Sequence, residues 1–247
     1  MTQHEDFYVG YQDRAPRRLA RFLAPWVTVL LTAAMGLAAV LAAIQKPPSP
    51  VVFEFGIVRE FQGRIRERPY PMLEVDSRNA GGAYMLVGEG KRGAADLTDG
   101  LDGREVTIRG TLIYRGIHTM VEIHEPPVVL DQSPTPRMVA RTQGSVELSG
   151  EIVDAKCHLG AMNPGSGATH RACAIRCLLG GVPPLLVVEN AEGSGSVTVI
   201  AGPNGSPLDP TLLGSVGIPV RIRGQLRRSA GWVILETDLN SIVRTGR

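Results

Sequence analysis

The hydropathy pattern divides the chain into one long apolar run and a longer region of short, alternating segments. No charged residue occurs from Phe22 to Ile44, and a helix needs about 20 apolar residues to cross the hydrocarbon core of a bilayer. We therefore predict that the chain contacts the membrane through a transmembrane helix over residues 22–44. A tail over 1–21 precedes this helix, and a linker over 45–52 follows it.

The charges that flank the apolar run predict its orientation. Arg14, Arg17, Arg18 and Arg21 precede it and only Lys46 follows closely, so the positive-inside rule puts the N-terminus in the cytoplasm. We expect a single-pass protein of the bacterial inner (cytoplasmic) membrane, with its C-terminal domains in the periplasm or outside. A cleaved signal peptide is the alternative, but its apolar region usually spans only about 7–15 residues. We favour an uncleaved anchor.

Beyond the linker, short β-branched runs separated by glycine and turn residues predict an all-β region. Two successive sets of runs align, with VTIRGTL at 106–112 matching VRIRGQL at 220–226. The first set covers residues 57–67, 71–76, 83–88, 104–113 and 118–124, and the second covers 146–153, 185–190, 196–201, 218–226 and 232–238. Five strands with an irregular or helical link between the third and fourth indicate the OB-fold, a small Greek-key barrel. A generic antiparallel sandwich is the alternative.

We thus predict a mainly β chain with two OB-like five-stranded barrels, over residues 53–130 and 144–247, joined by a polar linker over 131–143. The spacing from Gly150 to Gly224 is 27 residues longer than the corresponding spacing from Gly63 to Gly110. This difference predicts an insertion over residues 155–184, between the first two strands of the second barrel. In OB-folds that loop commonly contributes to ligand binding.

Composition and motifs exclude several functions. A formal net charge of +2 and an aromatic content of 5% argue against a nucleic-acid partner. The sequence has no nucleophile elbow, HExxH motif, phosphate-binding loop or dinucleotide fingerprint. We therefore assign no catalytic and no organic-cofactor residues, and we favour a non-enzymatic function over an enzymatic one. Gly88 to Lys91 is expected only to end a hairpin.

All three cysteines and two of the five histidines lie in the predicted insertion. His170, Cys173 and Cys177 fall at positions i, i+3 and i+7 of a predicted helix and share one face. Cys157 lies on the preceding loop and can fold back over that face. Three thiolates and one imidazole form an established structural zinc site, so we predict zinc as the cofactor and these four residues as its ligands.

Neighbouring residues complete the predicted site. Thr169 offers a capping hydroxyl for the start of the helix, and Gly180 and Gly181 offer a left-handed C-cap. Asp154 and His158 are candidates for supporting the ligands from outside. Because His158 is adjacent to Cys157 in the sequence, the two are not expected to bind one ion together.

Other chemistries remain open for the cysteine cluster. An iron–sulfur cluster also uses thiolates and histidine. A disulfide from Cys157 to Cys173 or Cys177 would suit an oxidising compartment, but it leaves one thiol and His170 unexplained. The leading prediction is an accessory or structural metal-binding subunit of a membrane-associated, possibly redox, complex. The alternatives are a thiol-redox or iron–sulfur electron-transfer protein and a metal-delivery protein.

The inserted segment carries the one family resemblance. Residues 150–184, GEIVDAKCHLGAMNPGSGATHRACAIRCLLGGVPP, resemble a segment of uncharacterised bacterial membrane-anchored proteins. The shared pattern is GxIxDxxC followed by GxMxPGxGxxHRxCAxxCxxGGxPP. Its matching positions are Asp154, Cys157, Gly160, Met162, Pro164, Gly165, His170, Cys173 and Cys177. The resemblance implies no particular activity, and the rest of the chain resembles OB-folds only in strand order.

Overall fold

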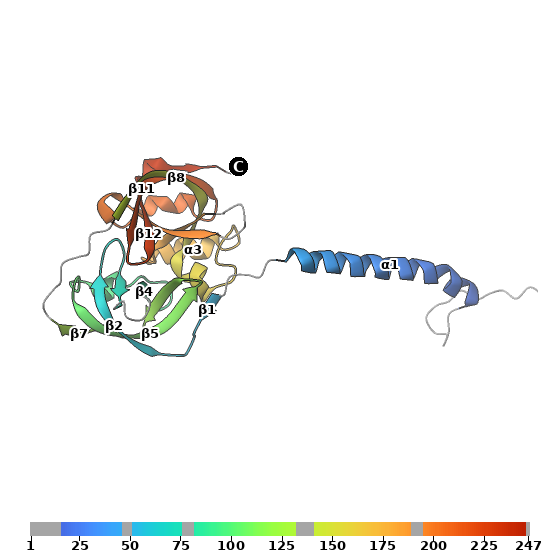
Figure 1. Ribbon diagram of the computed structural model, residues 1–247, viewed down its shortest axis with the longest axis horizontal. Helices are drawn as coiled ribbons and strands as arrows, with labels where there is room; N and C mark the ends of the chain where they lie inside the picture. The colour runs from blue at the N-terminus through green and yellow to red at the C-terminus, as the bar shows by residue number, and fades with distance from the viewer. Residues whose placement is uncertain (1–15, 46–50, 76–81, 132–140, 189–194, 246–247) are drawn as a thin grey trace, which may run out of the picture. The chain divides into compact units, whose positions relative to one another are not determined.

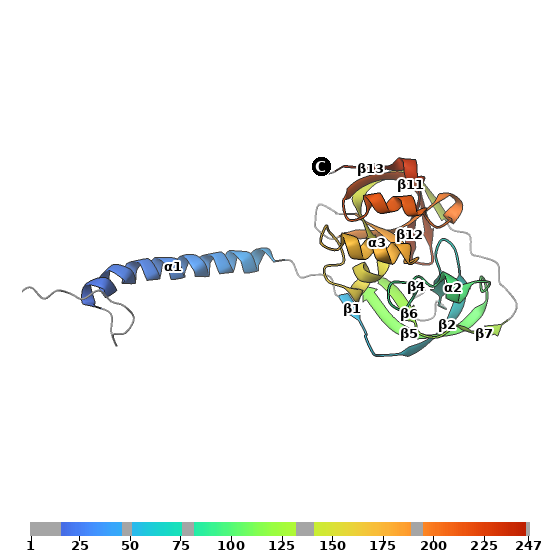
Figure 2. The same cartoon turned by 180° about the vertical axis from the view of Figure 1, so that it is seen from behind.

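The computed structural model describes residues 16–45, 51–75, 82–131, 141–188 and 195–245. These residues form two compact units, one with the N-terminal helix and one with both barrels. Parts of the predicted tail and of both linkers lie outside the described residues, as do the ends of the strands predicted at 71–76 and 185–190. Figures 1 and 2 show the elements from opposite sides.

The N-terminal helix α1 spans Arg17–Ile44, so it begins before the predicted anchor and ends with it. It is long and apolar enough to cross a membrane, and none of its residues is buried against protein. The hydroxyls of Thr28 and Thr32 donate to carbonyls one turn earlier, at 2.8 and 2.9 Å. Such internal bonds satisfy polar groups where no water is present.

The first barrel is closed by five strands in the order β2-β3-β4-β6-β5, with β5 pairing back to β2. Strands β4 and β6 are parallel, and the other neighbours are antiparallel. The strands are β2 (Arg59–Arg66), β3 (Met72–Glu74), β4 (Ala83–Gly88), β5 (Glu105–Arg115) and β6 (His118–Ile123). A short helix, α2 (Ala95–Thr98), connects β4 to β5, and β1 (Val51–Phe53) and β7 (Val128–Asp131) pair with β5 outside the barrel.

The second barrel repeats this topology as β8-β9-β10-β12-β11, with β11 pairing back to β8 and β10 parallel to β12. Its strands are β8 (Arg141–Asp154), β9 (Pro184–Val188), β10 (Ser196–Ala201), β11 (Pro219–Ser229) and β12 (Trp232–Glu236). The second barrel also carries the 3₁₀ helices η3 (Pro203–Gly205), η4 (Pro210–Ser215) and η5 (Leu239–Ser241) and strand β13 (Ile242–Arg244). Two barrels with the OB-like strand order confirm the predicted fold class.

Equivalent glycines mark the repeat in three dimensions. A Cβ atom on Gly63 or Gly150, in the first strand of each barrel, would collide with a backbone carbonyl of the second strand. A Cβ atom on Gly110 or Gly224, in the fourth strand, would collide with a carbonyl of the fifth. Two equivalent close approaches between strands therefore occur in each barrel, which explains why glycine recurs there.

Three apolar clusters hold the globular unit together. One fills the first barrel around Ile65, Leu86 and Ile108, and another fills the second barrel around Ile152 and Ile222. The third cluster lies between the barrels and draws residues from both. Its members include Met85, Met120, Ile113, Leu159, Cys157, Cys177 and Trp232. The predicted site therefore borders the core that joins the two barrels.

Hydrogen bonds between the barrels accompany this shared core. The indole Nε1 of Trp232 donates to the Ala83 carbonyl at 2.7 Å, and the Ala83 amide donates to the Ala230 carbonyl at 2.8 Å. The Tyr70 hydroxyl donates to the Ile200 carbonyl at 3.1 Å. These hydrogen bonds satisfy polar groups that are buried between the barrels. Separating the barrels would therefore break the bonds as well as expose apolar surface.

The predicted insertion lies between β8 and β9. It contains the π-helical turn η2 (Cys157–Ala161) and helix α3 (Arg171–Leu179). Figures 1 and 2 show this segment at the junction of the two barrels, where η2 contacts β1, β5 and β6 of the first. The insertion is therefore packed against both barrels rather than extending into solvent.

Candidate metal centre

The three cysteines lie on two helical segments, the π-helical turn η2 and helix α3. Cys157 begins η2, three residues after the last residue of β8, while Cys173 and Cys177 lie on α3. The structure corrects the predicted helix start, because His170 and not Thr169 is the N-cap residue. The His170 amide closes a preceding turn by donating to Gly167 O at 3.0 Å, and its carbonyl accepts the first helical bonds.

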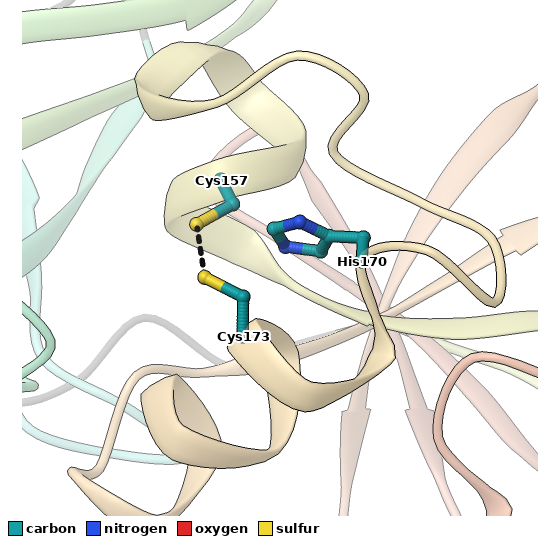
Figure 3. A group of neighbouring side chains, drawn as sticks. All are labelled: Cys157, His170 and Cys173. Carbon is teal, nitrogen blue, oxygen red and sulfur yellow. Dashed lines mark hydrogen bonds between the residues drawn. The ribbon is translucent and has the colours of Figure 1, made fainter.

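The sulfur atom of Cys157 lies close to both of the other sulfur atoms. The Sγ atom of Cys157 lies 3.9 Å from that of Cys173 and 3.9 Å from that of Cys177. Figure 3 shows Cys157 and Cys173 facing each other with the imidazole of His170 beside them. Ligand atoms of Cys157, His170 and Cys173 lie within 4.8 Å of one another. All three cysteines are free thiols, and the cluster of these four residues can hold a metal ion.

Asp154 holds the cluster together from its buried side. This carboxylate is fully buried; its Oδ1 accepts the Cys157 amide at 2.8 Å, and its Oδ2 lies 2.9 Å from His170 Nε2. Asp154 also groups with Cys157 and Cys177 within the same 4.8 Å limit. Because Nε2 of His170 is engaged, Nδ1 is the nitrogen that remains for an ion. A carboxylate that orients a histidine in this way is common around metal sites.

The protonation states of the cysteines are coupled. The hydrogen bond to Cys177, burial and the nearby Asp154 carboxylate raise the pKa of the Cys157 thiol. The same hydrogen bond lowers the pKa of Cys177 against the opposing effect of burial. Without an ion, the raised pKa favours the protonated form of Cys157, and a hydrogen bond joins its sulfur to that of Cys177. A metal that binds both must displace this proton.

Lys91 is a part of the site that the sequence interpretation missed. Its Nζ donates to the Cys173 sulfur at 2.8 Å, and this contact raises the pKa of the ammonium. The glycine turn from Gly88 to Lys91 was expected only to end a hairpin, but it carries this lysine from the first barrel to the cysteine cluster. Its signal in the sequence is weak, because nothing local relates residue 91 to residue 173.

A buried ion pair next to the cluster was also missed. Lys156 Nζ lies 2.8 Å from Glu122 Oε1 and donates to the carbonyls of Gly88 and Gly90 at 2.8 and 2.6 Å. Both charged side chains are buried. A buried lysine of this kind needs several acceptors to offset the loss of water. Because Lys156 directly precedes Cys157, its hydrogen bonds to Gly88 and Gly90 connect the start of η2 to the loop that carries Lys91.

His158 lies beside the cluster but in neither group of candidate ligands. Its side chain is buried and, within the described part of the chain, its Nδ1 atom has no hydrogen-bond partner. Burial, with help from the Arg115 charge, lowers the pKa of His158 to about 4. It therefore remains neutral at physiological pH. Its support of the ligands stays a prediction.

A separate pocket lies at the far end of α3. Its cavity of about 200 Å³ is bounded by Tyr70 and Pro71, by Leu178 and by the loop around Leu208. Two acidic residues also line it: Glu67 accepts the amides of Leu101 and Asp102, and Asp209 accepts the amide of Thr211. The pocket consequently offers mainly apolar surface, unlike the polar cysteine cluster.

No protein-family model, curated protein or solved structure matches the chain. The chemistry of the cysteine cluster is therefore inferred from its own geometry.

Proposed function

We propose that this protein binds one zinc ion through Cys157, His170, Cys173 and Cys177, and that the ion has a structural role. The observation that carries the proposal is the pair of 3.9 Å sulfur–sulfur distances. With zinc–sulfur bonds of about 2.3 Å and tetrahedral angles, two thiolates on one ion lie about 3.8 Å apart. The sulfur of Cys157 is thus already at the spacing from each of the other two sulfurs that a single tetrahedral ion requires.

The nature of the ligands favours zinc over harder cations. Thiolate and imidazole suit zinc and other soft or borderline ions, whereas calcium and magnesium prefer oxygen ligands. Three sulfurs and one nitrogen fill four positions, which is typical of a structural site rather than of a catalytic site with an open position. The ion would order a glycine-rich segment and fasten η2 to α3.

The membrane location is part of the proposal. Helix α1 has the length and apolarity of a membrane span, and arginines cluster at its N-terminal end. We propose that both barrels lie on the outer side of a bacterial inner membrane, where they serve as an accessory subunit of a membrane-associated complex. On native gels of gently solubilised membranes, the protein would migrate above the size of a single chain. Migration as a single chain would contradict the accessory role.

The test of the metal site is elemental analysis of the full-length protein, purified without oxygen in detergent, with thiols counted on the same sample. We expect one zinc per chain and its loss in the Cys173→Ser variant. A matched control is His124→Gln, which changes a histidine on the first barrel that hydrogen-bonds Thr111 and Glu89. This control should retain the zinc.

The same sample separates the alternatives. Iron with acid-labile sulfide would replace the proposal with electron transfer. Absence of metal together with one reducible disulfide would replace it with a thiol-redox role, for which Cys157 has two partners at equal distance. Zinc that exchanges rapidly with a chelator would favour metal delivery.

A further inference from the structure

We infer that Lys91 is a functional residue of the metal centre: its ammonium hydrogen-bonds a metal-bound Cys173 thiolate, so that the first barrel helps to hold an ion whose ligands all come from the second. The inference rests on the proposed metal site. It adds to that site a positioning residue outside the Cys/His cluster.

The contact itself is the first support. Lys91 Nζ lies 2.8 Å from Cys173 Sγ, and Cys173 is the most exposed of the three cysteines. Cys157 and Cys177 are enclosed by the core between the barrels. Lys91 therefore contacts the sulfur of the least buried cysteine, and its ammonium brings N–H donors to that side of the cluster.

Charge is the second support. Three thiolates and a neutral imidazole around a divalent ion leave a net charge of about −1, and the buried Asp154 carboxylate adds to it. The other lysine near the cluster, Lys156, is buried and already paired with Glu122. Among the described residues that hydrogen-bond the sulfurs, Lys91 is the cation. A hydrogen bond between ionised groups is stronger than one between neutral groups.

The backbone around Lys91 supports its position. Gly93 N donates to Gly180 O at 2.8 Å, which fixes the Lys91 loop to the C-terminal end of α3. A Cβ atom on Gly180 would collide with the Lys91 carbonyl, so glycine is required for this close approach. From the other side, Lys156 donates to Gly88 O and Gly90 O. The loop is held at both ends, and the lysine between them is positioned with respect to Cys173.

The test measures zinc release from full-length protein in detergent after a chelator is added in excess. We expect Lys91→Met to release zinc about tenfold faster than wild type, since it removes a charged hydrogen bond at a partly exposed site. Lys91→Arg keeps the charge and N–H donors, and should stay close to wild type. The matched control is Arg92→Met, which removes the adjacent positive charge from the same loop and should release zinc at the wild-type rate.

A second measurement distinguishes a direct effect on the sulfur from a general loosening of the fold. With cobalt in place of zinc, the sulfur-to-cobalt charge-transfer band reports the donor strength of the thiolates. A hydrogen bond lowers the energy of the sulfur lone pair, so its loss in Lys91→Met should move the band to longer wavelength. Arg92→Met should leave the band unchanged.

The outcomes separate the inference from the proposed function. If wild-type protein binds neither zinc nor cobalt stoichiometrically, both are wrong. If wild type binds the ion but Lys91→Met matches Arg92→Met in release rate and in band position, the metal site stands and the role of Lys91 is refuted. Faster release with the band shift supports the inference.

Discussion

The Nε2 atom of His170 lies 2.9 Å from Oδ2 of Asp154, and both side chains are buried. The other carboxylate oxygen accepts the Cys157 amide, so a single residue at the end of β8 positions ligands from η2 and from the start of α3. Asp154 thereby connects the rigid barrel to the inserted segment.

Replacing Asp154 with Asn tests this relationship. The neutral amide loses the charge that orients the His170 ring, and we expect metal affinity to fall by about 10–100-fold. Competition titration with a colorimetric chelator measures the change. Asp209→Asn makes the same chemical change at a helix cap, where asparagine caps about as well, and should leave affinity unchanged. Equal affinities in the two variants would contradict the role of Asp154.

Metal removal should lower the thermal stability of the wild-type protein. An ion that binds only the folded state stabilises it by about 4 kcal/mol at a thousand times its dissociation constant. A chelator should therefore lower the melting temperature of wild type. Cys177→Ser removes a ligand, so its melting temperature should already be low and insensitive to the chelator. A chelator effect of equal size in both proteins would show that the metal acts elsewhere.

The buried pair of Lys156 and Glu122 predicts a large mutational effect. Lys156→Met leaves the Glu122 carboxylate buried without its cation, and we expect the free energy of unfolding to fall by about 3–5 kcal/mol. Chemical denaturation measures this change. The exposed pair of Arg109 and Glu125, at 2.9 Å, provides the control, because Arg109→Met should cost at most about 1 kcal/mol.

A second variant tests whether the uncompensated charge is the cause. Adding Glu122→Leu to Lys156→Met removes the stranded carboxylate, and we expect the double variant to recover much of the lost stability. If the double variant is no more stable than Lys156→Met alone, the loss arises from packing or from the bonds to Gly88 and Gly90 instead.

Acid should weaken the contact between the barrels through His118. This ring packs on Trp232 with centroids 4.8 Å apart, and burial lowers its pKa below the ordinary 6.5. The folded state therefore binds its proton less readily than the unfolded chain. The stabilising effect is fully present above pH 6.5 and is lost progressively as the pH falls from 6.5 through the lowered pKa of the folded state.

The variant His118→Gln isolates this contribution, because glutamine does not titrate. Wild type should lose more stability than His118→Gln between pH 7.5 and pH 5.5, measured by chemical denaturation. His158, whose pKa is lowered chiefly by burial, remains in both proteins; the charge of His118 has only a minor effect on that pKa, so most of the His158 contribution cancels. Parallel losses in the two proteins would show that His118 does not contribute.

The sequence by itself determined features that depend on local repetition. An uncharged run from Phe22 to Ile44 predicts a long apolar helix, and alternating apolar residues around Gly110 and Gly224 predict the same strands in two barrels. The excess length between Gly150 and Gly224 locates the insertion. Helical spacing also places Cys173 and Cys177 on one face, because it depends only on the rise and twist of a helix.

Only the tertiary structure decided how distant residues complete the site. It shows that Cys157 returns to within 3.9 Å of both other sulfurs, that Asp154 engages His170 and that Lys91 contacts Cys173, 82 positions away. It also joins the two barrels through a shared core, although the sequence suggests separate domains on a linker. Such contacts depend on how whole barrels pack, and neither periodicity nor residue spacing carries that information.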